Sequence, residues 1–349
     1  MVAKKFGRVF SACLLAGFVV LAFTTHGALA QTITLKAHTF IGVKAPTIAK
    51  LMAPWAKKVE KESNGRLKID IYPSMQLGGK PPQLIDQVRD GVVDIVWTLP
   101  GYTPGRFVKT EVFELPFVHT NPVATNLAIQ DFIEKHGDEL ANVKVILMHV
   151  HAGGMFHSYD PIRKVSDVKG MKIRTPSRTG GWLLEAMGAV PIGAPVPKVP
   201  ELLSKRVVDA VMLPFEITIA LKTHEMVDHH AELDDAKYPR FNTSTFLFAM
   251  NKRKYDSLPA DLKKVIDNNS GRNIAREIGE VWQAVEAPGE KAARASGTIY
   301  KMPASEVKIL KEQVARQVHD KWIAEVNAKG IDGAALLREA QELVAKYTK

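Results

Sequence analysis

The chain is 349 residues long, with 46% hydrophobic, 24% charged and 7% aromatic residues. This composition excludes a disordered chain, a collagen-like repeat and a protein with many membrane spans, and the length indicates two domains. The formal net charge is +10, but the cations are scattered among 37 acidic residues without a long basic run, so we expect no nucleic-acid partner. Cys13 is the one cysteine, which excludes a disulfide framework and a Cys-rich zinc site.

The first thirty residues have the pattern of a secretory signal peptide. A basic start is followed by an almost wholly apolar run over Val9–Phe23, and the segment closes with Ala28-Leu29-Ala30. This order is typical of a signal that is removed after its last small residue. A single membrane anchor is the weaker interpretation, because the run is short for a bilayer and no basic stop-transfer cluster follows it. We therefore expect residues 1–30 to be cleaved after Ala30.

Short alternating or apolar runs then alternate with helical patterns, which favours an α/β fold. In the first half, the pattern predicts a strand over 32–38, a helix over 45–62, a strand over 67–72, a helix over 81–90, a strand over 92–98, a helix over 121–136 and a strand over 143–151. The rhythm then restarts, with a strand over 171–174, helices over 179–187 and 199–205, and strands over 207–213 and 241–250.

Two similar units in succession predict two lobes with a hinge and a ligand cleft between them. We expect lobe I over 31–152 and lobe II over 153–239, with a segment near 240–258 that returns to lobe I through the strand around Phe246.

The last ninety residues read as helical, over 259–287, 305–327 and 333–347. The first of these is long for a globular helix, and Pro288 must kink or interrupt it near its end. We expect the segment 259–349 to pack across both lobes.

The sequence lacks the usual enzyme motifs. It has no G-x-S-x-G elbow, no P-loop and no G-x-G-x-x-G turn, so we predict no catalytic residue and no cofactor. The best metal candidate is the segment 224–230, where His224 and Asp228 would share a helix face beside His229. A solvent-exposed polar helix end is the favoured interpretation, because spacing places no further ligands.

Arg174 is the most informative cation, because it ends a short apolar strand. A buried cation is costly unless it is paired, and an arginine can grip a carboxylate with two parallel hydrogen bonds. The helix that follows would add its N-terminal amides to an anion site. A salt bridge from Arg174 to an internal acid is an equally good interpretation of the spacing.

A series of motifs runs through nearly the whole chain after residue 30. They are Gln76–Gly79, Gln83–Gly91, Val93–Ile95, Glu114–Phe117, Val168–Arg174, Leu203–Asp209, Met250-Asn251 and Leu258-Pro259. In this order, behind a signal peptide, they resemble the solute-binding proteins of TRAP (tripartite ATP-independent periplasmic) transporters. Each motif alone is weak, whereas the ordered set is specific.

The resemblance implies a two-lobed periplasmic binding protein with a long C-terminal helix that crosses both lobes. It implies that a small organic acid is trapped between the lobes and delivered to a TRAP membrane permease. Arg174 matches the family's substrate arginine and would bind the ligand carboxylate. Sugar-acid binders of the family often carry a second arginine, where this chain has Ala152–Phe156. We therefore expect a monocarboxylate with an apolar body, of the aromatic-acid type.

Several other side chains are candidates to line this cleft. They are Trp97, Phe40, Tyr102, Met212 and Phe215 as apolar walls, with His38 and His157 as hydrogen-bonding groups. Core packing for each aromatic residue, and a structural role for each histidine, remain open as alternatives.

Two rival functions remain open. One is an exported metal-dependent hydrolase that uses His224, Asp228 and His229. The other is a periplasmic sensor partner with the same fold. We expect a monomer, because packing over both lobes accounts for the apolar face of the C-terminal helices.

Overall fold

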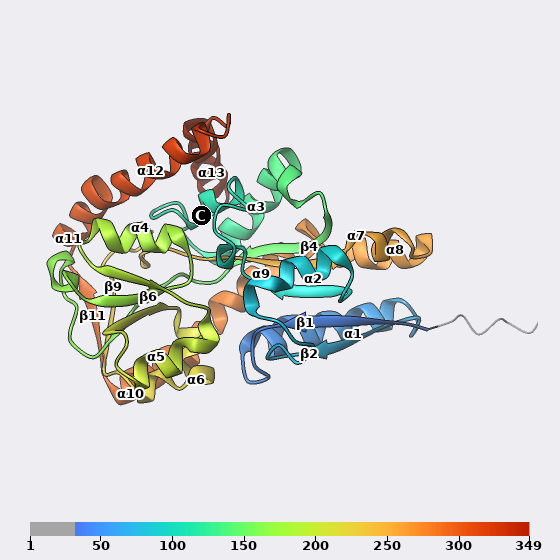
Figure 1. Cartoon of the computed structure of the whole chain (residues 1–349), viewed down its shortest axis with the longest axis horizontal. Coiled ribbons are helices and arrows are strands. Elements are labelled where there is room, and N and C mark those ends of the chain that lie inside the picture. Colours follow the sequence, from blue (N-terminus) through green and yellow to red (C-terminus); the bar gives the residue numbers. More distant parts are fainter. Residues whose placement is uncertain (1–31, 349) are drawn as a thin grey trace, which may run out of the picture. The chain divides into compact units, whose positions relative to one another are not determined.

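The computed structural model describes residues 32–348, which form two β-sheets with helices packed around them (Figure 1). The signal peptide expected over residues 1–30 lies outside the described residues. The mixed sheets and flanking helices confirm the α/β fold class. We call the first sheet with its helices the first lobe, and the second sheet with its helices the second lobe.

The first sheet is mostly parallel, but its fourth strand runs the other way. In spatial order its strands are β2 (Leu67–Tyr72), β1 (Ile33–Thr39), β3 (Ile95–Thr98), β10 (Thr245–Asn251) and β4 (Val143–Val150). Strand β10 pairs antiparallel with both β3 and β4. Every residue of β3 and β10 is buried, which explains why both read as continuous apolar runs rather than as alternating patterns.

The second sheet mixes parallel and antiparallel pairs of shorter strands. In spatial order these are β11 (Thr298–Met302), β9 (His229–Leu233), β5 (Met155–Ser158), β8 (Ala210–Leu213), β6 (Lys172–Thr175) and β7 (Val190–Gly193). The sequence pattern missed β5, β7, β9 and β11, because runs of four or five residues show little periodicity.

The helices begin and end at recognisable signals. Asn121 caps one helix by accepting a hydrogen bond from the Ala124 amide, and Ser177 caps another by accepting from Gly180, while Gly91 ends a third in the left-handed conformation. In the first two-thirds of the chain the α-helices are α1 (Ala53–Glu62), α2 (Leu84–Asp90), α3 (Pro122–His136), α4 (Arg178–Ala186), α5 (Val199–Ser204) and α6 (Phe215–Leu221). Those that follow are α7 (Lys252–Asp256), α8 (Ala260–Asn268), α9 (Arg272–Ala284), α10 (Glu286–Ser296), α11 (Ala304–Ile309), α12 (Ala315–Asn327) and α13 (Gly333–Tyr347).

Shorter helical turns precede or continue several of these helices. They are the π-helical turns η1 (Thr47–Met52) and η9 (Leu310–Val314), and the 3₁₀ turns η2 (Pro81–Gln83), η3 (Pro100–Tyr102), η4 (Thr110–Glu114), η5 (Gly137–Leu140), η6 (Val165–Val168), η7 (Val196–Lys198) and η8 (Thr223–Glu225).

The chain passes between the two sheets more than once. It leaves β4 for β5 through residues 151–154 and returns from β9 to β10 through residues 234–244, so the strand around Phe246 pairs with β3 and β4 in the first sheet. The two passages are hydrogen-bonded to each other: the Gly154 amide donates to the Asn242 carbonyl (2.8 Å) and the Phe241 amide donates to the Gly154 carbonyl (3.1 Å). We call residues 151–154 and 240–244 the linking segments.

The single helix expected over residues 259–287 is wrong. Helix α8 stops at Asn268, and Gly271 takes a φ of +56°, a conformation that does not continue a right-handed helix. Helices α9 and α10 follow one another through Val285, with α9 packed on α3 and α10 packed on α6. This pair therefore provides the helical crossing, and Pro288 is accommodated in the first turn of α10, where no amide donor is needed.

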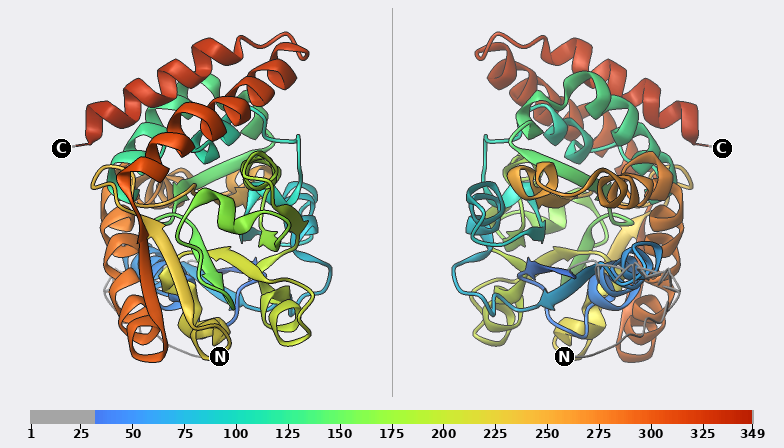
Figure 2. Two further views of the ribbon diagram at one scale, coloured as in Figure 1. Left: turned by 90° about the vertical axis from the view of Figure 1, so that its left-hand side faces the viewer. Right: turned by 90° about the vertical axis from the view of Figure 1, so that its right-hand side faces the viewer.

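The C-terminal region contacts both lobes. Helix α12 packs on α4 of the second lobe, while α13 packs on α3 of the first lobe. Figure 2 shows α12 and α13 together, in red, at the top of both views. The region is not entirely helical as expected, because β11 adds an edge strand to the second sheet by pairing with β9.

The close contact between α3 and α9 depends on Gly279. A Cβ atom at this position would lie 2.6 Å from the Cα of Val123, so Gly279→Ala must push the two helices apart. We expect the substitution to lower the free energy of unfolding by about 1–3 kcal/mol, measured by urea denaturation. Gly193→Ala is the matched control, because a Cβ there meets nothing within 4 Å. Equal stability of the two variants would contradict this account.

Candidate ligand-binding site

A cavity between the two sheets is lined by residues from both lobes. The first lobe contributes Phe40, Ile41, Thr47, Trp97, Leu99, Tyr102 and Phe246, and the linking segments contribute His151 and Ser244. The second lobe contributes Arg174, Pro176, Val196, Met212, Leu213, Pro214, Glu216 and Ile217. The lining is mostly apolar, with few polar groups, as in pockets that bind small organic molecules.

Arg174 is the cation of this cavity. Strand β6 places it at 1% exposure, where its Nε donates to the Ala194 carbonyl (2.8 Å) and its Nη1 donates to the Met212 carbonyl (3.3 Å). Its Nη2 has no hydrogen-bond partner. Among residues 32–348 no carboxylate lies within 4 Å of the guanidinium, which removes the alternative of an internal salt bridge. A buried cation with a free donor edge is the feature that an anion site requires.

Tyr102 connects the two lobes beside this arginine. The turn η3 places its phenol oxygen where it accepts a hydrogen bond from the Val196 amide of the second lobe (2.8 Å). Burial raises the pKa of Tyr102, so the phenol is neutral at physiological pH. Burial lowers the pKa of Arg174, but a guanidinium remains protonated under these conditions.

Aromatic rings form the first-lobe wall of the cavity. Trp97 on β3 stacks on Phe246 of β10, with centroids 4.6 Å apart and planes inclined by 13°. Phe40 lies 5.4 Å from Trp97 and contacts Tyr102 edge-on at 5.2 Å. The Trp97 indole nitrogen donates to His149 Nε2 (2.9 Å), which fixes the ring orientation. This wall is suited to a flat, apolar ligand body.

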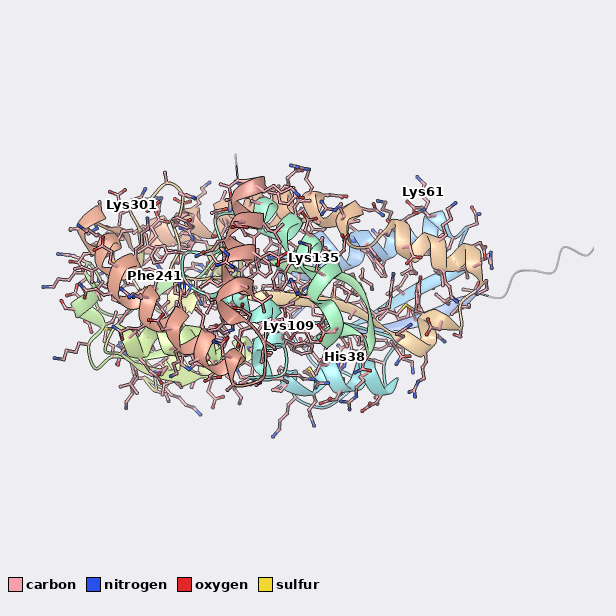
Figure 3. The ribbon with its side chains drawn as sticks, turned by 90° about the horizontal axis from the view of Figure 1, so that it is seen from above. His38, Lys61, Lys109, Lys135, Phe241 and Lys301 are labelled. Atoms are coloured by element: carbon pink, nitrogen blue, oxygen red, sulfur yellow. The ribbon has the colours of Figure 1, made fainter. Side chains whose placement is uncertain are left out.

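Five of the eight residues predicted for the site line this cavity: Arg174, Trp97, Phe40, Tyr102 and Met212. The structure does not bring the other three to it. His38 Nδ1 is hydrogen-bonded to Gln87 (2.8 Å), His157 Nδ1 is 2.8 Å from His230 Nδ1, and Phe215 packs among Met155 and Ala293. Figure 3 labels His38 to the right of centre, in the first lobe, and Phe241 of a linking segment toward the left. The histidines thus have structural partners, and Phe215 belongs to the core.

Sequence reasoning missed Phe246 and Glu216. Phe246 lies on the strand that was predicted to return to the first lobe, and that return was a usable signal. His151 directly follows β4, and its Nδ1 accepts a hydrogen bond from the Gly153 amide (2.8 Å). Glu216 is the one charged residue in the apolar segment 210–221, and this isolated charge was a usable signal.

Glu216 is a buried carboxyl group in the first turn of α6, 9% exposed. Burial, with a smaller contribution from the charge of Glu286, raises the pKa of Glu216 to about 8. The side chain is therefore a neutral acid at pH 7, and Arg174 is the charged group among the residues that line the cavity.

The metal candidates are not assembled as expected. His224 lies in the short turn η8 and bonds the Thr218 carbonyl (3.2 Å), whereas His229 lies on β9 against Tyr300. Asp228 is outside any helix, so it shares no helix face with His224. Within the described part of the chain, no three His, Cys, Asp or Glu side chains form a group that could hold a metal ion.

The comparisons with known proteins assign the chain to a family. Residues 39–325 match the model of bacterial extracellular solute-binding protein, family 7. The chain belongs to this family. This confirms the resemblance to TRAP solute-binding proteins that was drawn from the ordered motifs.

Solved structures of TRAP solute-binding proteins are similar over nearly the whole chain. One from a marine metagenome, described as specific for aromatic acid ligands and crystallised with 3-hydroxybenzoate, is 43% identical, covers 91% of this chain and 100% of its own, and gives a TM-score of 0.89. Another, from Rhodoferax ferrireducens T118 in complex with copurified benzoate, is 44% identical. It covers 90% of this chain and 98% of its own, with a TM-score of 0.88. The outer membrane transporter protein TsaT of Comamonas testosteroni is 26% identical over 313 residues, 88% of this chain and 90% of its own.

As a member of the TRAP solute-binding family, the protein is a two-lobed binding component of a transport system, and its relatives include periplasmic binding proteins. Over residues 32–348, no helix has both the length and the apolar character to cross a membrane.

The burial of Arg174 without a counter-ion has a consequence for stability. We expect Arg174→Met to raise the free energy of unfolding of the unliganded protein by about 1–2 kcal/mol, because an apolar side chain of similar volume replaces a desolvated charge. Urea denaturation after removal of ligand by unfolding and refolding measures the change. Arg316→Met, at an exposed position, is the control and should change stability little. Destabilisation by Arg174→Met would contradict the account.

Proposed function

We propose that this protein captures a small aromatic monocarboxylate in the periplasm and delivers it to a TRAP membrane permease. The observation that carries the proposal is the unpaired edge of the Arg174 guanidinium in a cavity walled by aromatic rings. The ligand carboxylate would complete the hydrogen bonding of Arg174, and its ring would pack against Trp97 and Phe246. The relatives crystallised with benzoate and with 3-hydroxybenzoate support this ligand class.

We propose that binding closes the lobes about the linking segments. Lobe I would comprise residues 31–152 with 240–258, lobe II residues 153–239, and residues 259–349 would pack across both. The Tyr102–Val196 hydrogen bond would form in the closed state, since it joins the two lobes next to Arg174. Closure excludes water and so strengthens the pairing of the guanidinium with the ligand carboxylate.

We propose that the chain is exported by cleavage after Ala30 and acts as a monomer. The binding step needs no cofactor in this proposal, because a side chain neutralises the ligand charge and apolar walls contact the ring.

Side chains of Lys61 and Lys301 extend from the outer surface near opposite ends of the view in Figure 3, which is consistent with the dispersed charge of the sequence.

Replacement of Arg174 tests the proposal. We expect the wild-type protein to bind benzoate, and Arg174→Gln to weaken binding at least about 100-fold, because the carboxylate loses its charged partner in a water-free site. Arg174→Lys should weaken it less than Gln does, since the charge remains but the paired donors are lost. Isothermal titration calorimetry measures both.

The control for this experiment is Arg316→Gln, at an exposed position outside the cavity. It should bind benzoate as the wild type does. A folded Arg174→Gln protein with unchanged benzoate affinity would overturn the assignment of Arg174 as the carboxylate-binding residue.

The affinity for benzoate should depend on pH through Glu216. Arg174, Tyr102 and His151 line the same cavity as Glu216, the Glu216 amide donates to Glu286, and Glu286 pairs with Arg240. Burial keeps the pKa of His151 well below 6.5, so that ring stays neutral above pH 7. Above pH 8 Glu216 ionises and repels the ligand carboxylate, so we expect the Kd to rise about tenfold between pH 7 and pH 9.

Fluorescence or calorimetric titrations over pH 6–9 measure this dependence. Glu216→Gln cannot ionise, and its benzoate affinity should be flat across the same range. A wild-type affinity that does not change between pH 7 and pH 9 would contradict the prediction.

A further inference from the structure

Two buried polar atoms in the cavity wall lack a partner. Among the residues that line the cavity, all of them within the described range, these are Nη2 of Arg174 and Oε2 of Glu216. Buried polar groups are otherwise almost always hydrogen-bonded. The ligand carboxylate accounts for the first atom, and the second is left without an explanation.

No neighbouring cation accounts for Glu216. Arg240 pairs with Glu232 and with Glu286 (3.4 Å), and Glu286 in turn accepts a hydrogen bond from the Glu216 backbone amide (2.9 Å). The backbone of Glu216 is thus held, while its side chain forms no hydrogen bond or ion pair with residues 32–348. Glu216 lines the cavity together with the apolar residues Pro214 and Ile217.

We propose that Glu216 recognises a hydroxyl group on the ring of the bound acid, so that this protein prefers hydroxylated aromatic acids to unsubstituted ones. The inference rests on the proposed function, because it places the hydroxyl on a ligand whose carboxylate is held by Arg174. A carboxylic acid offers one donor and an acceptor, which matches the one donor and the acceptor lone pairs of a hydroxyl group. An unsubstituted ring leaves Glu216 unpaired in an apolar site, and that cost creates the discrimination.

The charges in the cavity agree with this role. At pH 7 burial holds Glu216 neutral, since its pKa is raised to about 8. The ligand carboxylate then neutralises the one charged lining group, Arg174, and the hydroxyl is met by an uncharged acid. A second ligand carboxylate would instead place a surplus negative charge beside Glu216, which disfavours dicarboxylates.

Other polar side chains in the lining are weaker candidates for this contact. The hydroxyl groups of Ser244 and Thr47 line the cavity, but neither is a buried atom without a partner. His151 uses Nδ1 to accept from Gly153. Ser244→Ala is therefore a useful comparison, because it removes a cavity hydroxyl without touching Glu216.

The experiment measures the Kd values of benzoate, 3-hydroxybenzoate and 4-hydroxybenzoate by calorimetry at pH 7 for wild-type protein stripped of ligand. We expect at least one hydroxybenzoate to bind at least about tenfold more tightly than benzoate. In Glu216→Leu the ratio of the benzoate Kd to that of the preferred hydroxybenzoate should fall at least about fivefold. Glu216→Gln, which keeps a donor and an acceptor, should retain more of the ratio than Leu does.

Glu225→Leu is the matched control, because it removes an exposed carboxylate from the turn that follows α6, outside the cavity. It should leave both affinities unchanged. The melting temperature of each variant without ligand checks that it folds, and the Kd ratio within one variant is insensitive to a modest loss of stability.

Three results would overturn the inference while the proposed function survived. They are benzoate binding at least as tightly as both hydroxybenzoates, a preference that persists in Glu216→Leu, and a preference that is lost in Ser244→Ala instead. Tighter binding of 3-(aminomethyl)benzoate than of either hydroxybenzoate would also overturn it, since Glu216 would then be an ionised partner of a cation. If no aromatic acid binds, the proposed function fails, and this inference fails with it.

Discussion

The burial of one unpaired cation is the constraint on which the ligand site depends. Arg174 is almost fully buried and donates hydrogen bonds to two backbone carbonyls, while one donor of its guanidinium stays free. Within the described chain it forms no salt bridge. The desolvation of such a charge costs several kcal/mol. A ligand carboxylate offsets this cost, because it restores the missing ion pair. In the proposed function, stability is lost at this one position so that an organic anion can be bound between the lobes.

Apolar side chains from both lobes surround Arg174, and neither lobe provides this lining alone. The first lobe contributes Trp97, Phe246, Phe40 and Tyr102, and the second contributes Arg174, Met212 and the first turn of α6. The two linking segments bond to each other through Gly154 and Asn242. Together with the α9–α10 crossing, these segments join the lobes, and in the proposed function the lobes close about them.

Glu216 gives the site a second polar end without a second charge. Its pKa is raised because it is buried near Glu286, while Arg240 is already paired with other carboxylates. A neutral acid beside a single cation favours a monoanion over a dianion. The same group offers a hydrogen bond to a ring substituent, so charge selectivity and ring selectivity arise from one buried carboxyl group.

The α/β fold class and the place of Arg174 at the end of an apolar strand follow from the sequence, because periodicity and a cation after an apolar strand are local signals. The positions of individual side chains and of the helix and strand ends depended on tertiary structure. His38 and His157 were expected at the ligand, yet they bond Gln87 and His230, which are far away in sequence. The break at Gly271 and the short strand β11 depend on tertiary packing rather than on the sequence pattern.

Whether Arg174 pairs with an internal acid, and whether Glu216 is buried, depended on contacts between distant segments. By itself the sequence determined the α/β fold, the family and the cation, whereas only the tertiary structure decided that this cation has no partner and shares its cavity with an unpaired acid.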